Sequence, residues 1–268
     1  MEKSIPEYLY HYTSIANLVL ILSSGNIRFS RLDLVNDPEE GQADDLPIAS
    51  RHVFVSCWTA EKSESIPMWS LYAPDMRGCR IRLPADFLDT ALPVFNAGVP
   101  RRELINQLEV RVGKEDLKED FPVTVKYVDG PIEVQYTEDE SILRPQVIDI
   151  NASDLVIVPR SLGIAKRPEW GFEREWRYRI VAVLENLRDP VPVSVSGSKP
   201  PFGSIYALPM RTKALDPKLR TEVLKHIQIT MGPLAERSDW EIVNLARERY
   251  APEATVIESA IALRRRTI

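Results

Sequence analysis

The residues best suited to chemistry lie near the start of the chain and in a dense stretch much later in the sequence. His11, Tyr12 and Thr13 stand where an aromatic strand runs into a helix. A helix N-terminus presents free N–H groups and the positive end of a dipole to an anion. A histidine there can donate to a ribose hydroxyl, and a tyrosine ring can stack on a flat ligand. The structural alternative, which these three residues alone favour, is a strand with a satisfied histidine and a plain helix cap.

The later stretch, Trp170–Tyr178, combines aromatic and charged side chains. Glu173 and Glu175 are two positions apart at the start of an expected strand, so their side chains point to the same face. A half-buried carboxylate there can stabilise positive charge that develops on a substrate. The alternative is a strand with cross-strand ion pairs, in which Glu175 pairs with Arg177 or Arg179. The surrounding aromatic residues favour the functional interpretation.

Weaker signals lie between these two regions. Arg31 can meet a phosphate with two hydrogen bonds, or it can be tied to Asp37 or Glu39 in the turn that follows; the two readings are about equally supported. Cys57 can act as a nucleophile beside a histidine, although a buried strand cysteine is more often a small hydrophobic residue. A short helix following Pro67 is predicted to pack its larger side chains in the core: Met68, Trp69 and Tyr72.

Several classes of site find no support in the sequence. The histidines do not have metal-ligand spacing, and Cys57 and Cys79 form no CxxC pair, so no metal is expected. There is no phosphate loop, no dinucleotide-binding glycine motif and no nucleophile elbow. The net charge of -5 gives no indication of nonspecific nucleic-acid binding.

The composition describes the kind of chain that must position these residues. Hydrophobic residues make up 44% and charged residues 27% of 268 positions, which is typical of a globular protein with a sizeable core. No apolar stretch is long enough to span a bilayer, and no secretory signal is visible at the N-terminus. With only two cysteines, the chain suits a reducing compartment, so a cytoplasmic location away from membranes is expected.

Many short strands interrupted by a few helices predict an α+β fold with a mixed or antiparallel sheet core and flanking helices. We expect a single domain over residues 1–268 with a helical insertion around residues 85–120. Helices are predicted from a cap at Thr13 or Ser14 to Gly25, over 66–72, and after a capping box at Ser238–Glu241. Strands are predicted at 8–12, 26–30, 52–59, 78–83, 121–127, 132–136, 154–159, 175–184, 227–231 and 254–257.

Six motifs occur in a fixed order along the chain. They are Tyr10-His11-Tyr12-Thr13, Arg28-Phe29-Ser30, Asn36-Asp37-Pro38-x-Glu40, Val55-Ser56-Cys57, Met68-Trp69-x-x-Tyr72-Ala73 and Glu173-x-Glu175-Trp176-Arg177. As an ordered set they resemble the bacterial domain-of-unknown-function family 2971 over nearly the whole chain, from about residue 8 to residue 231. One departure is the acidic position of the turn motif, which either Glu39 or Glu40 can match.

This family has no settled activity, but its early His-Tyr-Thr and its late glutamate are similar to the ADP-ribosyltransferase superfamily. In that superfamily a histidine contacts the ribose of NAD and an aromatic ring stacks on nicotinamide. A glutamate holds the ribose hydroxyl and stabilises an oxocarbenium-like transition state. The resemblance therefore implies that Glu175 is catalytic and that Glu173 orients the acceptor. The expected cofactor-binding residues are His11, Tyr12, Thr13, Arg31 and Ser56.

Two functions follow as hypotheses. The first is an ADP-ribosyltransferase-like enzyme that uses NAD, without a metal, to modify a macromolecule in toxin, stress or phage-defence biology. The acceptor is a protein or a nucleic acid, and the sequence leaves its identity and the oligomeric state open. The second is a noncatalytic nucleotide- or partner-binding module that keeps the pocket but not the chemistry.

Overall fold

The computed structural model describes residues 4–89, 123–150, 155–157, 161–184, 191–194, 204–207 and 210–263. The helical insertion expected around residues 85–120 falls outside these ranges, apart from residues 85–89, which form a turn and an isolated bridge and no helix. The described helices include none with the length and apolar character needed to cross a membrane.

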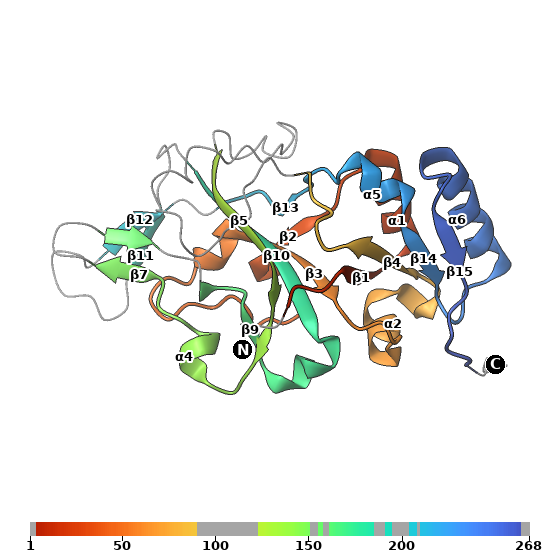
Figure 1. Cartoon of the computed structure of the whole chain (residues 1–268). Helices are drawn as coiled ribbons and strands as arrows, with labels where there is room; N and C mark the ends of the chain where they lie inside the picture. The colour runs from red at the N-terminus through yellow and green to blue at the C-terminus, as the bar shows by residue number, and fades with distance from the viewer. Residues whose placement is uncertain are drawn as a thin grey trace.

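A nine-stranded, mostly antiparallel sheet forms the centre of the described fold (Figure 1). Its strands run in the order β13-β2-β3-β1-β4-β14-β15, and β10 pairs with β3 and with β5. The members are β1 (Tyr8–Thr13), β2 (Phe29–Arg31), β3 (Val53–Thr59), β4 (Cys79–Pro84), β5 (Val123–Glu133), β10 (Glu175–Leu184), β13 (Ala214–Leu215), β14 (Gln228–Met231) and β15 (Thr255–Ile257). Within this sheet only the pairing of β14 with β15 is parallel.

Small two-stranded sheets flank this centre. They are β6 (Gln135–Tyr136) with β9 (Ala165–Lys166), β7 (Ile148–Ile150) with β8 (Leu155–Ile157), and β11 (Val191–Ser194) with β12 (Ser204–Ala207). The α-helices are α1 (Ile15–Ser24), α2 (Ile66–Tyr72), α4 (Glu140–Leu143), α5 (Thr221–Lys225) and α6 (Arg237–Tyr250). The 3₁₀ turns are η1 (Leu32–Leu34), η2 (Ala49–His52), η3 (Pro74–Met76) and η5 (Pro168–Glu173).

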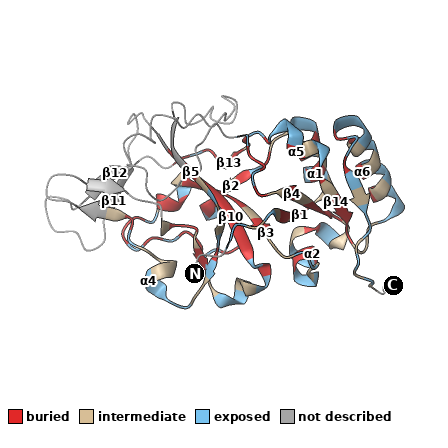
Figure 2. Ribbon diagram, viewed as in Figure 1, coloured by how far each residue is buried: buried red, intermediate tan, exposed pale blue. Residues whose placement is uncertain are grey.

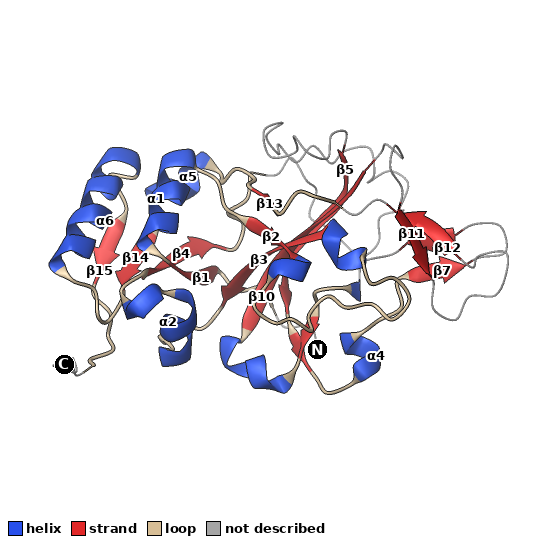
Figure 3. Ribbon diagram, turned by 180° about the vertical axis from the view of Figure 1, so that it is seen from behind, coloured by secondary structure: helices blue, strands red, loops and turns tan. Residues whose placement is uncertain are grey.

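Helices α1, α5 and α6 lie on one side of β1, β4 and β14, and α2 lies on the other side (Figures 1 and 3). Strand β1 explains this division because its side chains alternate between the two faces. Leu9 joins the large core formed with the three helices, while Tyr12 packs with Met68 and Trp69 of α2. The strands are mostly buried and the outer helix surfaces exposed (Figure 2).

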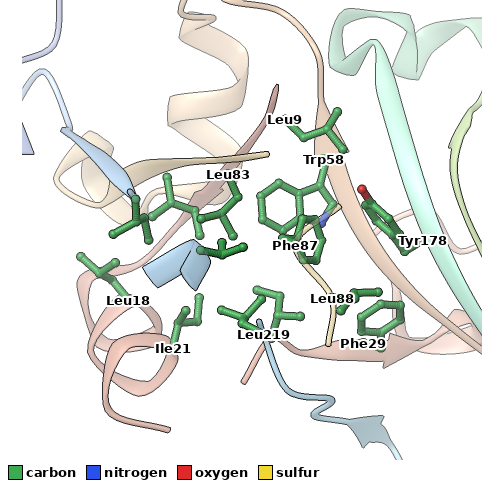
Figure 4. Close-up of a cluster of buried hydrophobic side chains, with 14 of the residues drawn as sticks. Leu9, Leu18, Ile21, Phe29, Trp58, Leu83, Phe87, Leu88, Tyr178 and Leu219 are labelled. Atoms are coloured by element: carbon green, nitrogen blue, oxygen red, sulfur yellow. The ribbon is translucent and has the colours of Figure 1, made fainter. Parts of the chain in front are cut away.

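The largest apolar cluster fills the space between the sheet and α1, and it extends along β3 and β10 (Figure 4). Trp58, Phe87 and Tyr178 form a run of tilted aromatic contacts within it, with ring centroids 4.5 and 4.6 Å apart. A second cluster, which includes Val53, Val55 and Val181, lies on the opposite face of these strands. Strands β3 and β10 are therefore covered on both faces.

The mostly antiparallel sheet with flanking helices confirms the coarse fold prediction. Helix α1 begins after Ser14, whose side chain accepts from the Asn17 N–H, and it ends at Gly25 in the left-handed conformation. The start of α6 differs from the prediction, since its capping box joins Glu236 to Asp239 in place of Ser238 and Glu241.

Two further strand predictions were wrong in detail. The two strands expected around Asp129 and Gly130 form one strand, β5, whose pairing with β10 shifts register near that glycine. The strand expected over 26–30 is shorter and begins at Phe29, while Asn26 makes only an isolated bridge to Lys218.

Candidate functional site

One edge of β3 is shared by two strands that diverge from each other. Strand β1 pairs with β3 only at Tyr10 and Thr59, while β2 pairs with the other end of the same β3 edge at Ser30 and Val55. Helix α1 connects the two diverging strands. Residues from all four elements line a cavity of about 590 Å³, a size within the range of roughly 300–1,000 Å³ that small-molecule sites occupy.

This cavity brings together most of the residues that the sequence pattern singled out. Its lining includes His11, Tyr12, Thr13, Ser56, Glu173 and Glu175. His11 and Tyr12 are neighbours on a strand and point to opposite faces, yet both reach the cavity because it opens beside β1.

Arg31 is not among the lining residues. Its guanidinium pairs with Asp33 at 2.6 Å and donates to the backbone carbonyls of Met210 and Thr212. Arg31 therefore holds the chain next to β13 in place. It does not line the cavity, where the sequence had suggested a contact with a phosphate. Arg28 lines the cavity instead, where it makes two hydrogen bonds of 3.0 Å to Asp216.

His11 is held by a backbone hydrogen bond and by a tilted contact with the Trp58 ring, whose centroid lies 5.1 Å away. Its Nδ1 lies 2.8 Å from the carbonyl oxygen of Cys57. A carbonyl only accepts, so Nδ1 carries the proton and Nε2 of the neutral ring has a lone pair. Burial lowers the pKa of His11 and outweighs the opposite effect of this hydrogen bond, which keeps the ring neutral at pH 7. His11 can therefore accept from a ligand hydroxyl, in place of the donor role that the sequence suggested.

The other N-terminal candidates are packed as well as cavity-lining. The Tyr12 ring meets Trp69 edge-on with centroids 4.8 Å apart, and its hydroxyl accepts from the Ser65 N–H. Thr13 accepts from the Asn17 side chain, and Ser56 accepts from the Trp58 indole N–H. The ring of Tyr12 is only 4% exposed, so packing in this structure limits the surface available for stacking.

A buried cluster of five charged side chains lies at one side of the cavity: Glu40, Lys166, Glu173, Glu175 and Arg177. Arg177 bonds both carboxylate oxygens of Glu175, at 2.5 and 2.9 Å, and also pairs with Glu40. The Lys166 ammonium lies 2.6 Å from Glu173 and 2.8 Å from Glu175. All five side chains are at most 5% exposed. When every member is ionised, three carboxylates face two cations.

The two cavity glutamates have different protonation behaviour. Burial opposes the charge of Glu175, but Arg177 and Lys166 outweigh it and lower the pKa of that carboxyl to about 2. Burial raises the pKa of Glu173, and Lys166 offsets only part of that effect. Tyr72 donates to Glu173, and the Tyr136 hydroxyl accepts from the Glu175 backbone N–H. Glu175 is thus ionised at neutral pH, and Glu173 is the more readily protonated of the pair.

Local backbone geometry explains how both glutamates reach Lys166. Glu173 ends η5, and Arg174 adopts a left-handed conformation with φ 43° and ψ 54° before β10 begins at Glu175. The prediction that both residues belong to one strand face was wrong because only Glu175 is in the strand. The turn at Arg174 instead brings the two carboxylates together at Lys166.

Two members of the cluster were missed by the sequence interpretation. Lys166 lies between unremarkable neighbours, and no motif indicated it. Glu40 did have a signal, in the turn motif that either of two glutamates could match. Glu40 is fully buried against Arg177, whereas Glu39 is 47% exposed and pairs with Arg167. Of the two glutamates, Glu40 is therefore the one that belongs to the buried cluster.

Cys57 lines the cavity but is poorly suited to nucleophilic attack. Burial and the neighbouring Glu175 raise the pKa of its thiol well above the ordinary value, so the thiol stays protonated. In the described part of the chain, no group of three or more His, Cys, Asp or Glu side chains is arranged to hold a metal ion.

Comparison of the chain with protein-family models, with curated proteins and with solved structures found no match.

Proposed function

We propose that the cavity binds NAD and that the chain transfers ADP-ribose from it to a macromolecule, as the resemblance to the ADP-ribosyltransferase superfamily implies. The observation that carries this proposal is that His11, Tyr12, Glu173 and Glu175 line one cavity, although Tyr12 and Glu173 are 161 positions apart in the sequence. The proposal includes the resemblance of the six ordered motifs to the bacterial domain-of-unknown-function family 2971.

The charge of the cluster supports this chemistry. When the bond from ribose to nicotinamide breaks, its electron pair leaves with the nicotinamide nitrogen and positive charge develops on the ribose carbon. The cluster contains one more carboxylate than it has cations, so it can stabilise that charge. The Nε2 lone pair of His11 can accept from a ribose hydroxyl and hold the sugar in place. Glu173 then orients the acceptor, whose nucleophilic atom forms the new bond to the ribose carbon.

One observation favours the second candidate, a noncatalytic binding module. Both carboxylate oxygens of Glu175 are engaged by Arg177, one of them also by Lys166, and the residue is only 2% exposed. A carboxylate that is fully paired in this way stabilises the cavity wall without contributing to turnover.

Calorimetry with NAD and an assay of nicotinamide release distinguish the two candidates. Glu175→Gln keeps the shape of the side chain and removes its charge, so NAD should still bind while release falls by about 10²–10³-fold. Glu39→Gln is the matched control because Glu39 is the neighbouring glutamate, pairs with Arg167 outside the cluster and does not line the cavity. This control should keep most of the wild-type rate.

The outcomes separate clearly when cell lysate supplies the acceptor. NAD binding without nicotinamide release by the wild-type protein would support the binding module. An equal loss of release in both variants would show that the effect is not specific to the Glu175 carboxylate. If the wild-type protein neither binds NAD nor releases nicotinamide, the NAD proposal fails.

A further inference from the structure

Lys166 occupies the centre of the charged cluster. It ends the short strand β9, which pairs in parallel with β6. Its ammonium contacts Glu173 at 2.6 Å and Glu175 at 2.8 Å, and it lies 3.7 Å from Glu40. The Trp170 ring centroid is 5.1 Å from the same nitrogen. The side chain is 5% exposed and lines the cavity.

The two cations of the cluster have different positions relative to the cavity. Arg177 joins Glu175 to Glu40 and donates to the Gly163 carbonyl, but it does not line the cavity. Lys166 lines the cavity and is the cation that bonds both cavity glutamates. An ammonium has three donors without a fixed plane, so it can hold two carboxylates that arrive from different directions.

Charge balance gives Lys166 a second effect. With Lys166 present, three buried carboxylates face two cations; without it, three would face Arg177 alone. A buried carboxylate that lacks a partner takes up a proton. Glu175 keeps both hydrogen bonds to Arg177, so Glu173 is the member that would become protonated.

We propose that Lys166 is a positioning residue of this site, which holds Glu173 and Glu175 in one arrangement and keeps Glu173 ionised. This role deepens the proposed function and rests on it where turnover is concerned. The ionisation of Glu173 is a property of the protein itself and can be measured without NAD.

The groups that face Glu173 determine the direction of the expected change. They come from four elements: Lys166 on β9, Tyr72 on α2, Glu175 on β10 and Tyr136 on β6. Of these, Lys166 is the cation. Its removal should therefore move the pKa of Glu173 further upward, and an activity that needs ionised Glu173 should be lost at a higher pH as the solution is acidified.

The test compares Lys166→Met and Lys166→Gln, which remove the charge, with Lys166→Arg, which keeps it. Glutamate labelled with ¹³C at the carboxyl carbon lets NMR follow the titration, and the signal missing from Glu173→Gln identifies Glu173. We expect the midpoint of Glu173 to rise by about 1–3 pH units in the Met and Gln variants, since one opposite charge within hydrogen-bond distance has that effect. Lys166→Arg should restore much of the wild-type midpoint.

Arg28→Met is the matched control for loss of one positive charge from the cavity lining, because the Arg28 guanidinium forms two hydrogen bonds to Asp216. Its Glu173 midpoint should stay at the wild-type value. An unchanged or lower midpoint in a folded Lys166→Met or Lys166→Gln protein would overturn the proposal. If neither variant folds, Lys166 is a folding residue and the assignment is also overturned.

The pH profile of nicotinamide release separates this inference from the proposed function. The acidic limb of kcat/KM should move upward with the Glu173 midpoint in Lys166→Met and return in Lys166→Arg. If the acidic limb of the kcat/KM profile for nicotinamide release is the same in wild type and Lys166→Met, the NAD proposal stands and the proposed role of Lys166 is wrong. A wild-type protein that releases no nicotinamide would remove the NAD proposal, while the NMR titration would still decide the role of Lys166.

Discussion

The two faces of β10 are equally buried but chemically opposite. Trp176, Tyr178 and Ile180 are between 1% and 8% exposed, and they lie on the side of the large apolar cluster. Glu175, Arg177 and Arg179 are between 0% and 3% exposed on the other side. Alternation along a strand normally separates a buried face from a solvated one. Here both faces of the strand are buried, one among apolar side chains and the other among paired charges, which Val181 of the second apolar cluster follows along the strand.

The two faces are expected to contribute differently to the stability of the fold. Burial of apolar surface is favourable by itself, at about 25 cal/mol per Å². A buried ion pair is different, because desolvation offsets much of the attraction and an apolar replacement of similar volume is often as stable. The charged face therefore contributes little to stability that apolar residues could not supply. Its arrangement beside a cavity is the better reason to regard it as a site.

The largest expected effects compare single substitutions on the two faces. Phe54 lies on β3 opposite Ile180 of β10 and belongs to the large apolar cluster. Phe54→Ala should lower the free energy of unfolding by about 3–5 kcal/mol through loss of a buried ring. Arg177→Met should lower it by about 3–5 kcal/mol, because Glu40 and Glu175 lose their partner. Urea denaturation measures both values.

A second substitution sharpens this comparison. Adding Glu40→Met to Arg177→Met removes both members of one pair, so part of the lost stability should return. For Phe54→Ala, by contrast, we expect no recovery of stability from the Glu40→Met substitution. If the double variant loses as much stability as Arg177→Met and Glu40→Met lose separately, added together, the two charges are not coupled and the charged face behaves like ordinary packing.

An intermediate effect is expected from acid. The folded pKa of Glu175 is about 2, below the value of about 4.3 for an unperturbed glutamate. Its contribution is therefore complete above about pH 4.5, and it is lost as the pH falls toward 2, by on the order of 3 kcal/mol. Denaturant midpoints measured from pH 7 to pH 3 should fall more steeply in wild type than in Glu175→Gln. Parallel curves would show that Glu175 is not stabilised by its partners.

The smallest stability effect is expected at His11. His11→Ala removes one hydrogen bond to a backbone carbonyl and a ring contact with Trp58, and it should cost about 1–2 kcal/mol. Trp69→Ala, which deletes a fully buried ring, should cost about 3–5 kcal/mol. NAD binding, measured by calorimetry, should weaken in the histidine variant. Thermal denaturation that ranks the two variants the other way would make His11 a core residue.

Local signals predicted the elements but not the cluster. Helix α1 has its cap and its terminating glycine within the segment itself, and β10 was predicted with the same limits as the structure gives. Whether a charged side chain is buried depends on partners that are distant in sequence. Glu40 is an example, since its partner Arg177 is 137 positions away. Lys166 is only seven positions from Glu173, but no local pattern shows that the η5 turn between them brings the two side chains together.

The pairing of Glu40 with Arg177 joins residues 137 positions apart. A ribosome adds roughly 5–20 residues each second, so a nascent chain carries Glu40 for on the order of ten seconds before its guanidinium partner is synthesised. Throughout that interval Glu40 must remain hydrated or bound elsewhere. The cavity is therefore completed only after translation has passed β10, and a shorter nascent fragment contains His11 and Tyr12 without the carboxylates that share their cavity.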